Sequence, residues 1–330
     1  MRAAFITGYG DNSVINYGDL PEPTVGPDEA LIEVRAAGLN PVEPAMRQGM
    51  FQAAFPFAFP QVMGFDISGV VISAPPTSSF VAGDEVYARL PSHTQGAYAE
   101  RVAAPIALLA AKPKEVGHVE AASLPTVALT TWQAFVERAK LAKGESVLIQ
   151  AGAGGIGSFA IQLAKHLGAV VTATAGPSNQ TWMTALGADR TIDYTLEDFE
   201  TAGPYDIVYD GVCGPLAARG IACLNPGGRY VGLVRMADAR AYQEMGLPRE
   251  AAEAMAAGIK PLVEQATARG ALFHGILTRP DRAQLADIAK VVDTGAIKPT
   301  VTQTYALSDL AGAYEALATG RTRGKLVIVP

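Results

Sequence analysis

The chain has 330 residues, a formal net charge of −6 and 49% hydrophobic residues, so it can bury a large core and should form two domains. It has no run of lysine or arginine, which argues against nucleic acid as a partner. No apolar segment reaches membrane-spanning length, and Ala3–Ile6 is too short for a signal peptide core, so we expect a cytoplasmic protein that does not bind membranes.

The first 120 residues are rich in glycine, proline and short alternating runs, which predicts a compact, mostly antiparallel β domain. The strands expected there are Arg2–Ile6, Ala30–Ala36, Ile67–Ile72, Glu85–Ala88 and Tyr98–Ala103. From about Val119 the pattern changes to helical periodicity over Glu120–Leu141, followed by alternating strands and helices.

This alternation predicts a doubly wound parallel sheet with helical crossovers. Its expected strands are Ser146–Gln150, Val170–Thr174, Arg190–Ile192, Asp206–Asp210, Gly228–Leu233 and Ala271–Thr278. The expected helices span 156–167, 178–186, 215–223, 248–268 and 281–293. The tail returns to strands at Val301–Ala306 and Lys325–Val329, which flank a helix over Ser308–Thr319. The fold class is therefore α/β, with a β-rich domain of residues 1–120 and 295–330 and a nucleotide domain of residues 121–294.

A strand–turn–helix unit in Glu145–Gly168 organises the nucleotide domain. Gly152, Gly155 and Gly157 stand where a dinucleotide-binding turn needs residues without Cβ: for tight reversal, approach of the pyrophosphate and helix–strand packing. The N–H groups at the start of the helix that follows point at an anion in the turn. The pattern favours dinucleotide binding over a plain structural turn, with Ala153, Gly154 and Ile156 completing the site.

Histidine and cysteine are scattered along the chain. The four histidines, at positions 93, 118, 166 and 274, have no metal-binding spacing, and the two cysteines, Cys213 and Cys223, form neither a disulfide framework nor a CxxC pair. The cysteines are interpreted as buried small residues. We therefore expect no catalytic metal centre.

Several sequence blocks, in order, resemble the zinc-independent quinone oxidoreductase branch of the medium-chain dehydrogenase/reductases. They lie at residues 36–49 (AAGLNPVEPAMRQG), 62–71, 81–88, 95–102, 121–135, 151–165 (AGAGGIGSFAIQLAK), 186–189 and 323–329. The resemblance implies a GroES-like catalytic domain joined to a Rossmann domain, and a cleft that holds nicotinamide. It also implies a homodimer, which we expect to form through Ala271–Thr278.

The zinc-dependent members of that superfamily have a cysteine where this chain has Asn40 and a His–Glu pair where it has Phe65 and Asp66. These residues cannot replace a zinc ligand set, so we expect no zinc. The remaining chemistry is hydride delivery from NADPH to a quinone or to the β-carbon of an enal or enone. Two rival readings stay open: an enoyl reductase for a carrier-bound or polyketide-like substrate, and an NADPH-binding protein without turnover.

The resemblance also assigns roles around the substrate. Asn40 resembles an asparagine that faces the nicotinamide ribose, and Thr130 resembles a position beside the nicotinamide amide and phosphate. Phe51 stands where relatives often carry a tyrosine, so solvent or the Thr126 hydroxyl is expected to supply the proton. An apolar group either walls a substrate pocket or packs a loop: Met50, Phe51, Phe55, Phe57 and Phe59.

NADP is preferred to NAD because no carboxylate follows the second strand, which ends at Thr174. Ser178 and Asn179 can donate hydrogen bonds to a 2′-phosphate, and Tyr194 matches a family position that contacts it. The candidates for its missing cationic partner are Arg190, Arg323 and Lys325.

Turns after the later strands should also reach the carboxyl edge of the sheet, where a dinucleotide lies. The cofactor-binding residues expected there are Gly211, Val212, Gly232, Leu233, Phe273, His274 and Gly275. Their glycines fit ordinary turns as well, and His274 taken alone is more typical of a core histidine with satisfied hydrogen bonds than of an acid–base group.

Overall fold

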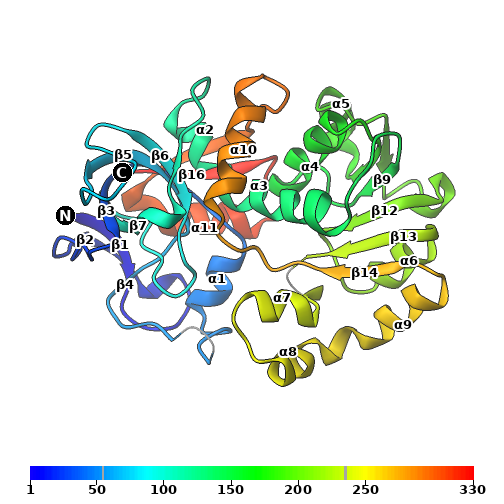
Figure 1. Cartoon of the computed structure of the whole chain (residues 1–330), viewed down its shortest axis with the longest axis horizontal. Coiled ribbons are helices and arrows are strands. Elements are labelled where there is room, and N and C mark those ends of the chain that lie inside the picture. Colours follow the sequence, from blue (N-terminus) through cyan, green and yellow to red (C-terminus); the bar gives the residue numbers. More distant parts are fainter. Residues whose placement is uncertain (54–55, 234–235) are drawn as a thin grey trace. The chain divides into compact units, whose positions relative to one another are not determined.

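The structure is a computed structural model that describes residues 1–53, 56–233 and 236–330. The chain divides into two compact units (Figure 1). The first unit comprises Met1–Val127, Pro280–Gly295 and Pro299–Pro330, and the second comprises Ala128–Arg279 and Ala296–Lys298. Helix α10 (Arg282–Asp293) thus lies in the first unit, whereas our sequence-based boundary assigned it to the nucleotide domain.

The first unit is built on two sheets. The larger has the order β15-β16-β3-β5-β6-β8, with β7 also paired to β3, and the smaller has the order β2-β1-β4. Neighbours are antiparallel except β15 and β16, which run parallel. The strands are β1 (Arg2–Ile6), β2 (Ile15–Asp19), β3 (Glu29–Gly38), β4 (Gln61–Val62), β5 (Asp66–Ser73), β6 (Glu85–Arg89), β7 (Arg101–Pro105), β8 (Ala110–Ala111), β15 (Val301–Ala306) and β16 (Lys325–Val329).

Strand β3 shows why this unit folds as a sheet. Its side chains alternate, so that Ala30, Ile32 and Val34 enter the core while Glu33 and Arg35 do not. Strand β7 starts at Arg101, later than the Tyr98–Ala103 segment that we predicted, because the residues before it make only an isolated bridge to β1, between Ala99 and Ala3.

The helices of the first unit are α1 (Val42–Arg47), α2 (His118–Ala122), the start of α3 (Pro125–Trp132), α10 and α11 (Leu310–Ala318). The helical periodicity predicted over Glu120–Leu141 is confirmed for most of its length, but the segment does not form one continuous helix. The chain forms α2, restarts as α3 and widens into a π-helical turn over Gln133–Arg138. Pro125 explains the break, because proline cannot donate a helical hydrogen bond but is favourable in a first turn.

The second unit confirms the predicted doubly wound sheet. Its order is β11-β10-β9-β12-β13-β14, with every pair parallel. Helices α4 and α5 cover one face, and α6 and α9 cover the other (Figure 1). The elements are β9 (Ser146–Ile149), α4 (Gly155–His166), β10 (Val170–Ala175), α5 (Gln180–Ala185), β11 (Arg190–Asp193), β12 (Tyr205–Asp210), α6 (Leu216–Ala222), β13 (Leu224–Gly232), α7 (Ala239–Glu244), α8 (Arg249–Ala256), α9 (Lys260–Ala268) and β14 (Leu272–Gly275).

Two expectations for this unit are corrected. The helix predicted over 248–268 is divided into α8, a 3-10 turn over Ala257–Ile259 and α9. Gly258 weakens the helix in the middle, and Pro261 starts a new one. Strand β14 is also shorter than the predicted Ala271–Thr278, and it forms the edge of the sheet.

None of the helices formed by residues 1–53, 56–233 and 236–330 combines the length and apolar character of a bilayer-spanning segment.

Candidate active site

The glycine-rich turn joins β9 to α4. The helix begins after Gly154, whose backbone is extended and which makes no side-chain cap bond. The first turn of any helix leaves N–H groups without helical partners, and its dipole favours an anion there. The turn therefore offers backbone donors of the kind that bind a pyrophosphate.

Gly157 allows the closest approach in this turn. A Cβ placed on Gly157 would lie 2.3 Å from the Ala151 carbonyl oxygen and 2.7 Å from the Gly152 Cα. A Cβ on Gly154 would lie 3.5 Å from the same oxygen, which is ordinary contact. Ala151 itself has φ +54°, a left-handed conformation that is unfavourable for alanine. Gly157 thus lets helix α4 pack directly on the turn.

The next turn, after β10, holds the residues expected to meet a 2′-phosphate. Thr174 accepts a 2.9 Å hydrogen bond from the Gly152 N–H through its carbonyl, which connects the two turns. Ser178 and Asn179 follow in a 3-10 turn over Pro177–Asn179. The exposed Tyr194 places its hydroxyl 3.6 Å from where a Cβ on Gly176 would lie. The structure thus brings these groups to one corner.

The three candidate cations have different surroundings. The Arg190 guanidinium pairs with the Glu197 carboxylate. Lys325, a candidate partner of the 2′-phosphate in our sequence analysis, is buried in the first unit, where its ammonium donates to the Leu39 carbonyl and to the Asn40 side chain. Arg323 precedes β16 in the same unit.

Strand β12 ends in a turn that Asp210 organises. Its Oδ1 accepts hydrogen bonds from the N–H groups of Val212 (2.8 Å) and Cys213 (2.7 Å), and its Oδ2 accepts one from the Tyr230 hydroxyl (2.5 Å). Gly211 starts this turn, and Val212 is 50% exposed. The turn therefore presents an apolar side chain at the carboxyl edge.

The ends of β13 and β14 are equally tight. A Cβ on Gly232 would lie 2.5 Å from the Met236 Cβ, and one on Gly275 would lie 2.1 Å from the Met236 carbonyl oxygen. Leu233, after Gly232, is buried. Both glycines therefore serve close packing of the edge whether or not a cofactor is bound.

Phe273 stacks on Tyr230 with ring centroids 5.1 Å apart, as a core side chain does. Within the described part of the chain, the buried Nε2 of His274 has no hydrogen-bond partner. His274 therefore differs from the core histidine with satisfied hydrogen bonds that the sequence suggested. Burial lowers the pKa of His274 below its usual range, which favours the neutral imidazole.

Helix α3 is tied to the segment after β14. The Thr130 and Thr278 hydroxyls lie 2.5 Å apart, and the Gln133 amide donates to the Arg279 carbonyl at 3.0 Å. Thr130 is 3% exposed. These bonds fix the position of the residues that follow β14.

The first unit contains a buried polar cluster at the positions compared with the zinc-dependent enzymes. The Asn40 amide donates to Asp66 Oδ2 (3.1 Å), and its oxygen accepts from the Lys325 ammonium (2.7 Å). Lys325 also donates to the Leu39 carbonyl and lies 3.8 Å from Asp66 Oδ2. Thr126 donates to Asp66 Oδ1 through its N–H (3.0 Å) and its hydroxyl (2.7 Å). Asp66 thus orients the predicted proton donor.

Glu43 extends this cluster. It is fully buried, accepts from the Asn40 amide at 3.2 Å, and accepts from the hydroxyls of Tyr98 and, at 3.3 Å, Tyr314. Burial raises the pKa of Glu43 to about 7, although Tyr98, Lys325 and Asn40 act in the opposite direction. Asn40, which we expected to face a ribose, is 2% exposed and connects two carboxylates to an ammonium.

Zinc does not fit this donor set. Asn40, Phe65 and Asp66 provide one carboxylate without thiolate or imidazole, and the Lys325 ammonium lies beside that carboxylate. Across the residues that the structure describes, no group of three or more His, Cys, Asp or Glu side chains is arranged to hold a metal ion.

Only part of the apolar group after α1 packs against the core. Phe51 and Phe57 are partly buried against the core, whereas Met50 is 66% exposed. Tyr9, which sequence reasoning missed, stacks on Phe57 at 5.8 Å and meets Phe59 edge-on at 5.1 Å. Phe55 lies outside the described residues.

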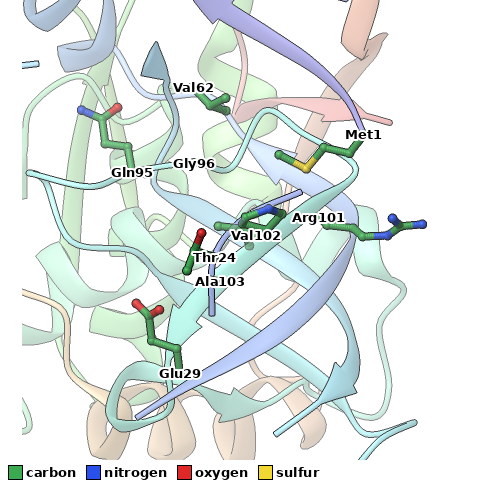
Figure 2. A pocket seen from close by; sticks show the side chains of 10 residues that line it. Met1, Thr24, Glu29, Val62, Gln95, Gly96, Arg101, Val102 and Ala103 are labelled. Carbon is green, nitrogen blue, oxygen red and sulfur yellow. The ribbon is translucent and has the colours of Figure 1, made fainter. Parts of the chain in front are cut away.

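A pocket of about 250 Å³ lies elsewhere in the first unit (Figure 2). None of the predicted site residues lines it. It is bordered by Met1, Pro23, Thr24, Glu29, Val62, Gln95, Gly96, Arg101, Val102 and Ala103.

Sequence reasoning also missed two buried polar residues. Gln150 leads into the glycine-rich turn, and Arg89 is paired with Asp66 in the β5–β6 register. Both have buried nitrogen atoms without a hydrogen-bond partner among the residues described. Gln150 ends a predicted strand and Arg89 directly follows one, so a polar residue beside a buried strand was the available signal.

Comparison with known proteins agrees with this architecture. Residues 26–114 match the alcohol dehydrogenase GroES-like domain, and residues 186–328 match a zinc-binding dehydrogenase domain. The chain is 33% identical to the mitochondrial NAD(P)H oxidoreductase RTN4IP1 of Mus musculus, over 99% of this chain and 89% of the relative. It is 36% identical to the chloroplastic NADPH-dependent alkenal/one oxidoreductase of Arabidopsis thaliana, over 71% of this chain and 62% of that protein.

The solved quinone oxidoreductase of Coxiella burnetii is similar along its whole length. It has a TM-score of 0.85 and 31% sequence identity, with 100% of this chain and 99% of that chain covered. The family resemblance and the fold class predicted from sequence are thus confirmed, and the chain is an oxidoreductase that belongs to the quinone oxidoreductase-like branch of the medium-chain dehydrogenase/reductase superfamily.

Proposed function

We propose that the protein is an NADPH-dependent, zinc-independent reductase that transfers hydride to quinones or to the activated C=C bond of enals and enones. The observation that carries this proposal is the Lys325 ammonium beside Asp66, in a cluster without thiolate or imidazole. The names of similar proteins support the substrate class: an alkenal/one oxidoreductase, a 2-methylene-furan-3-one reductase and a quinone oxidoreductase homologue.

The second unit supplies groups that fit the dinucleotide. The turn at Gly152–Gly157 would hold the pyrophosphate on backbone N–H groups, and Gly157 leaves room for that turn to close. Ser178, Asn179 and Tyr194 would receive the 2′-phosphate. Bound NADPH supplies the hydride, and the protein orients it and excludes water.

The first unit supplies the groups that handle the proton. Thr126 is oriented by two hydrogen bonds to Asp66, and it is only partly buried. Its hydroxyl would relay a solvent proton to the α-carbon after hydride has reached the β-carbon. Glu43 belongs to the same hydrogen-bonded cluster, and burial raises its pKa to about 7, so its carboxyl group can gain or lose a proton near neutral pH.

The test is consumption of NADPH or NADH by purified protein with free enals, enones, quinones and enoyl thioesters. The proposal expects turnover of the free acceptors and preference for NADPH. Turnover of the thioesters alone would identify an enoyl reductase, and tight NADPH binding without turnover of any acceptor would identify a nucleotide-binding protein. Either result would replace the proposal.

We also propose a homodimer formed through β14. This strand is the edge of the sheet, and Leu272 on it is 57% exposed. Sedimentation of Leu272→Lys should then give a monomer, whereas an unchanged dimer would exclude this edge. A cytoplasmic location stays a prediction, since the relatives named above are mitochondrial or chloroplastic.

A further inference from the structure

The side chain of Gln180 joins backbone carbonyls at the ends of two neighbouring strands. Gln180 is the first residue of α5, and its Nε2 donates to the carbonyls of Ala175 (3.0 Å), Gly176 (3.1 Å) and Ile192 (3.3 Å). Ala175 ends β10, and Ile192 lies on β11, which pairs with β10 in parallel. An amide nitrogen has two N–H groups, so one of them is shared between carbonyls. Gln180 therefore links the carboxyl ends of both strands.

The same carbonyls hold residues that we assign to the 2′-phosphate. The Ala175 carbonyl also accepts from the Tyr194 N–H (3.4 Å), and the Gly176 carbonyl also accepts from the Asn179 N–H (3.1 Å). The Tyr194 hydroxyl lies 3.6 Å from where a Cβ on Gly176 would be. A shift of either carbonyl would therefore move the backbone of a residue that should bind the phosphate.

The phosphate corner, formed by Ser178, Asn179 and Tyr194, is accessible from solvent. Tyr194 is 66% exposed, Ser178 is exposed, and Asn179 is partly exposed. These residues and Gln180 all belong to the second unit, within Ala128–Arg279. The second unit alone can therefore offer this corner to a ligand.

The charged side chains on β11 are already engaged. The Arg190 guanidinium pairs with Glu197, and Asp193 Oδ1 accepts from the N–H (3.0 Å) and the hydroxyl (2.7 Å) of Thr195. The phosphate corner itself offers only neutral donors. Because neutral donors bind an anion less strongly than charged ones and weaken steeply in poor geometry, their placement should determine the affinity for a phosphate.

We propose that Gln180 is a positioning residue that makes the protein prefer NADP to NAD. This role rests on the proposed NADPH-dependent function. By linking the ends of β10 and β11, the Gln180 amide holds Tyr194 and Asn179 in place before the cofactor arrives, so a 2′-phosphate meets donors that are already oriented. NAD lacks this phosphate and gains nothing from that orientation.

The first test compares two small ligands that differ only in the 2′-phosphate: adenosine 2′,5′-bisphosphate and adenosine 5′-monophosphate. Neither contains nicotinamide, so isothermal titration measures the adenosine end of the site without turnover. The native protein should bind the bisphosphate at least about tenfold more tightly than the monophosphate. Gln180→Met keeps the length of the side chain and removes the amide. It should lose most of this ratio by weakening the bisphosphate and not the monophosphate.

Gln265→Met is the matched control. Gln265 is also a helical glutamine whose Nε2 donates to a backbone carbonyl, that of Ala218 at 2.9 Å. It lies on α9, which covers the opposite face of the sheet from α5 (Figure 1), so this variant should keep the native ratio. Gln180→Lys keeps N–H donors for the carbonyls and adds a positive charge, so it should bind the bisphosphate at least as tightly as the native protein.

A double variant tests whether Gln180 acts through the tyrosine. Tyr194→Phe alone should lower the ratio of the two affinities, because it removes one phosphate donor. Gln180→Met added to Tyr194→Phe should lower the ratio by a smaller factor than it does alone, since the hydroxyl that it positions is then absent. Equal factors in the two backgrounds would overturn the coupling.

Failure of the native protein to prefer the bisphosphate would overturn the proposal without any variant, so the test does not depend on whether Gln180→Met folds. A folded Gln180→Met with the native ratio would overturn it too. Equal weakening of both ligands would do the same, because a purely structural role predicts that result. If the protein preferred the bisphosphate but reduced no acceptor, the reductase function would fail by itself.

Discussion

Substitution of Gly157 by alanine is the sharpest test of the glycine-rich turn. The new Cβ would lie 2.3 Å from the Ala151 carbonyl oxygen and 2.8 Å from the Gly152 carbonyl carbon. Both neighbours are backbone, so no flexible side chain can move aside. The turn must shift by roughly 1 Å to restore ordinary contact, and overpacking of this kind costs about 1–3 kcal/mol.

The same shift would displace the backbone donors that should hold the pyrophosphate. We expect Gly157→Ala to bind NADPH at least about tenfold more weakly, which corresponds to ~1.4 kcal/mol. Isothermal titration gives the affinity, and urea unfolding followed by circular dichroism gives the loss of stability.

Gly154→Ala is the matched control, because its Cβ would be 3.5 Å from the same carbonyl oxygen. It should unfold at close to the native urea concentration. If Gly157→Ala bound NADPH and unfolded like the native protein, the reasoning about this turn would be refuted.

Three further predictions concern buried polar groups. Gln150→Met should raise the free energy of unfolding by about 1–2 kcal/mol, because the buried amide atoms have no partner among the described residues; a destabilised variant in urea would contradict this. Lys325→Met should lower the free energy of unfolding by about 3–5 kcal/mol in the same assay, because it leaves the buried Asp66 carboxylate without its positive partner. The double variant Lys325→Met/Asp66→Asn should recover part of that loss. Burial lowers the pKa of His118 below its ordinary 6.5, so the unfolded chain takes up the proton more readily and stability should fall as pH drops below about 6.5. His118→Gln should weaken the fall in melting temperature at low pH. An unchanged dependence of melting temperature on pH would contradict this role of His118.

The sequence predicted the second unit well because its signals are local. The run Ser146–Ile149, the glycines after it and the helical period of α4 lie within about one supersecondary unit. Breaks inside long helical patterns were harder, since the pattern of 248–268 continues through Gly258 although the helix does not.

The polar cluster of the first unit was only partly accessible from sequence. Asn40 and Thr126 were chosen by resemblance, but Glu43 meets Tyr98, 55 positions away, and Tyr314, 271 positions away. Such contacts arise from how the strands pair. Lys325 shows the same limit, because a lysine near a chain end suggests a solvated cation until β16 places it beside Asp66.

We propose that the protein reduces its acceptors with NADPH and without zinc. The direct measurement is oxidation of NADPH with an enone by protein dialysed against a chelator, with its zinc content determined in parallel. We predict unchanged turnover in protein that holds far less than one zinc per chain. Loss of turnover after chelation, with recovery when zinc is restored, would contradict the account.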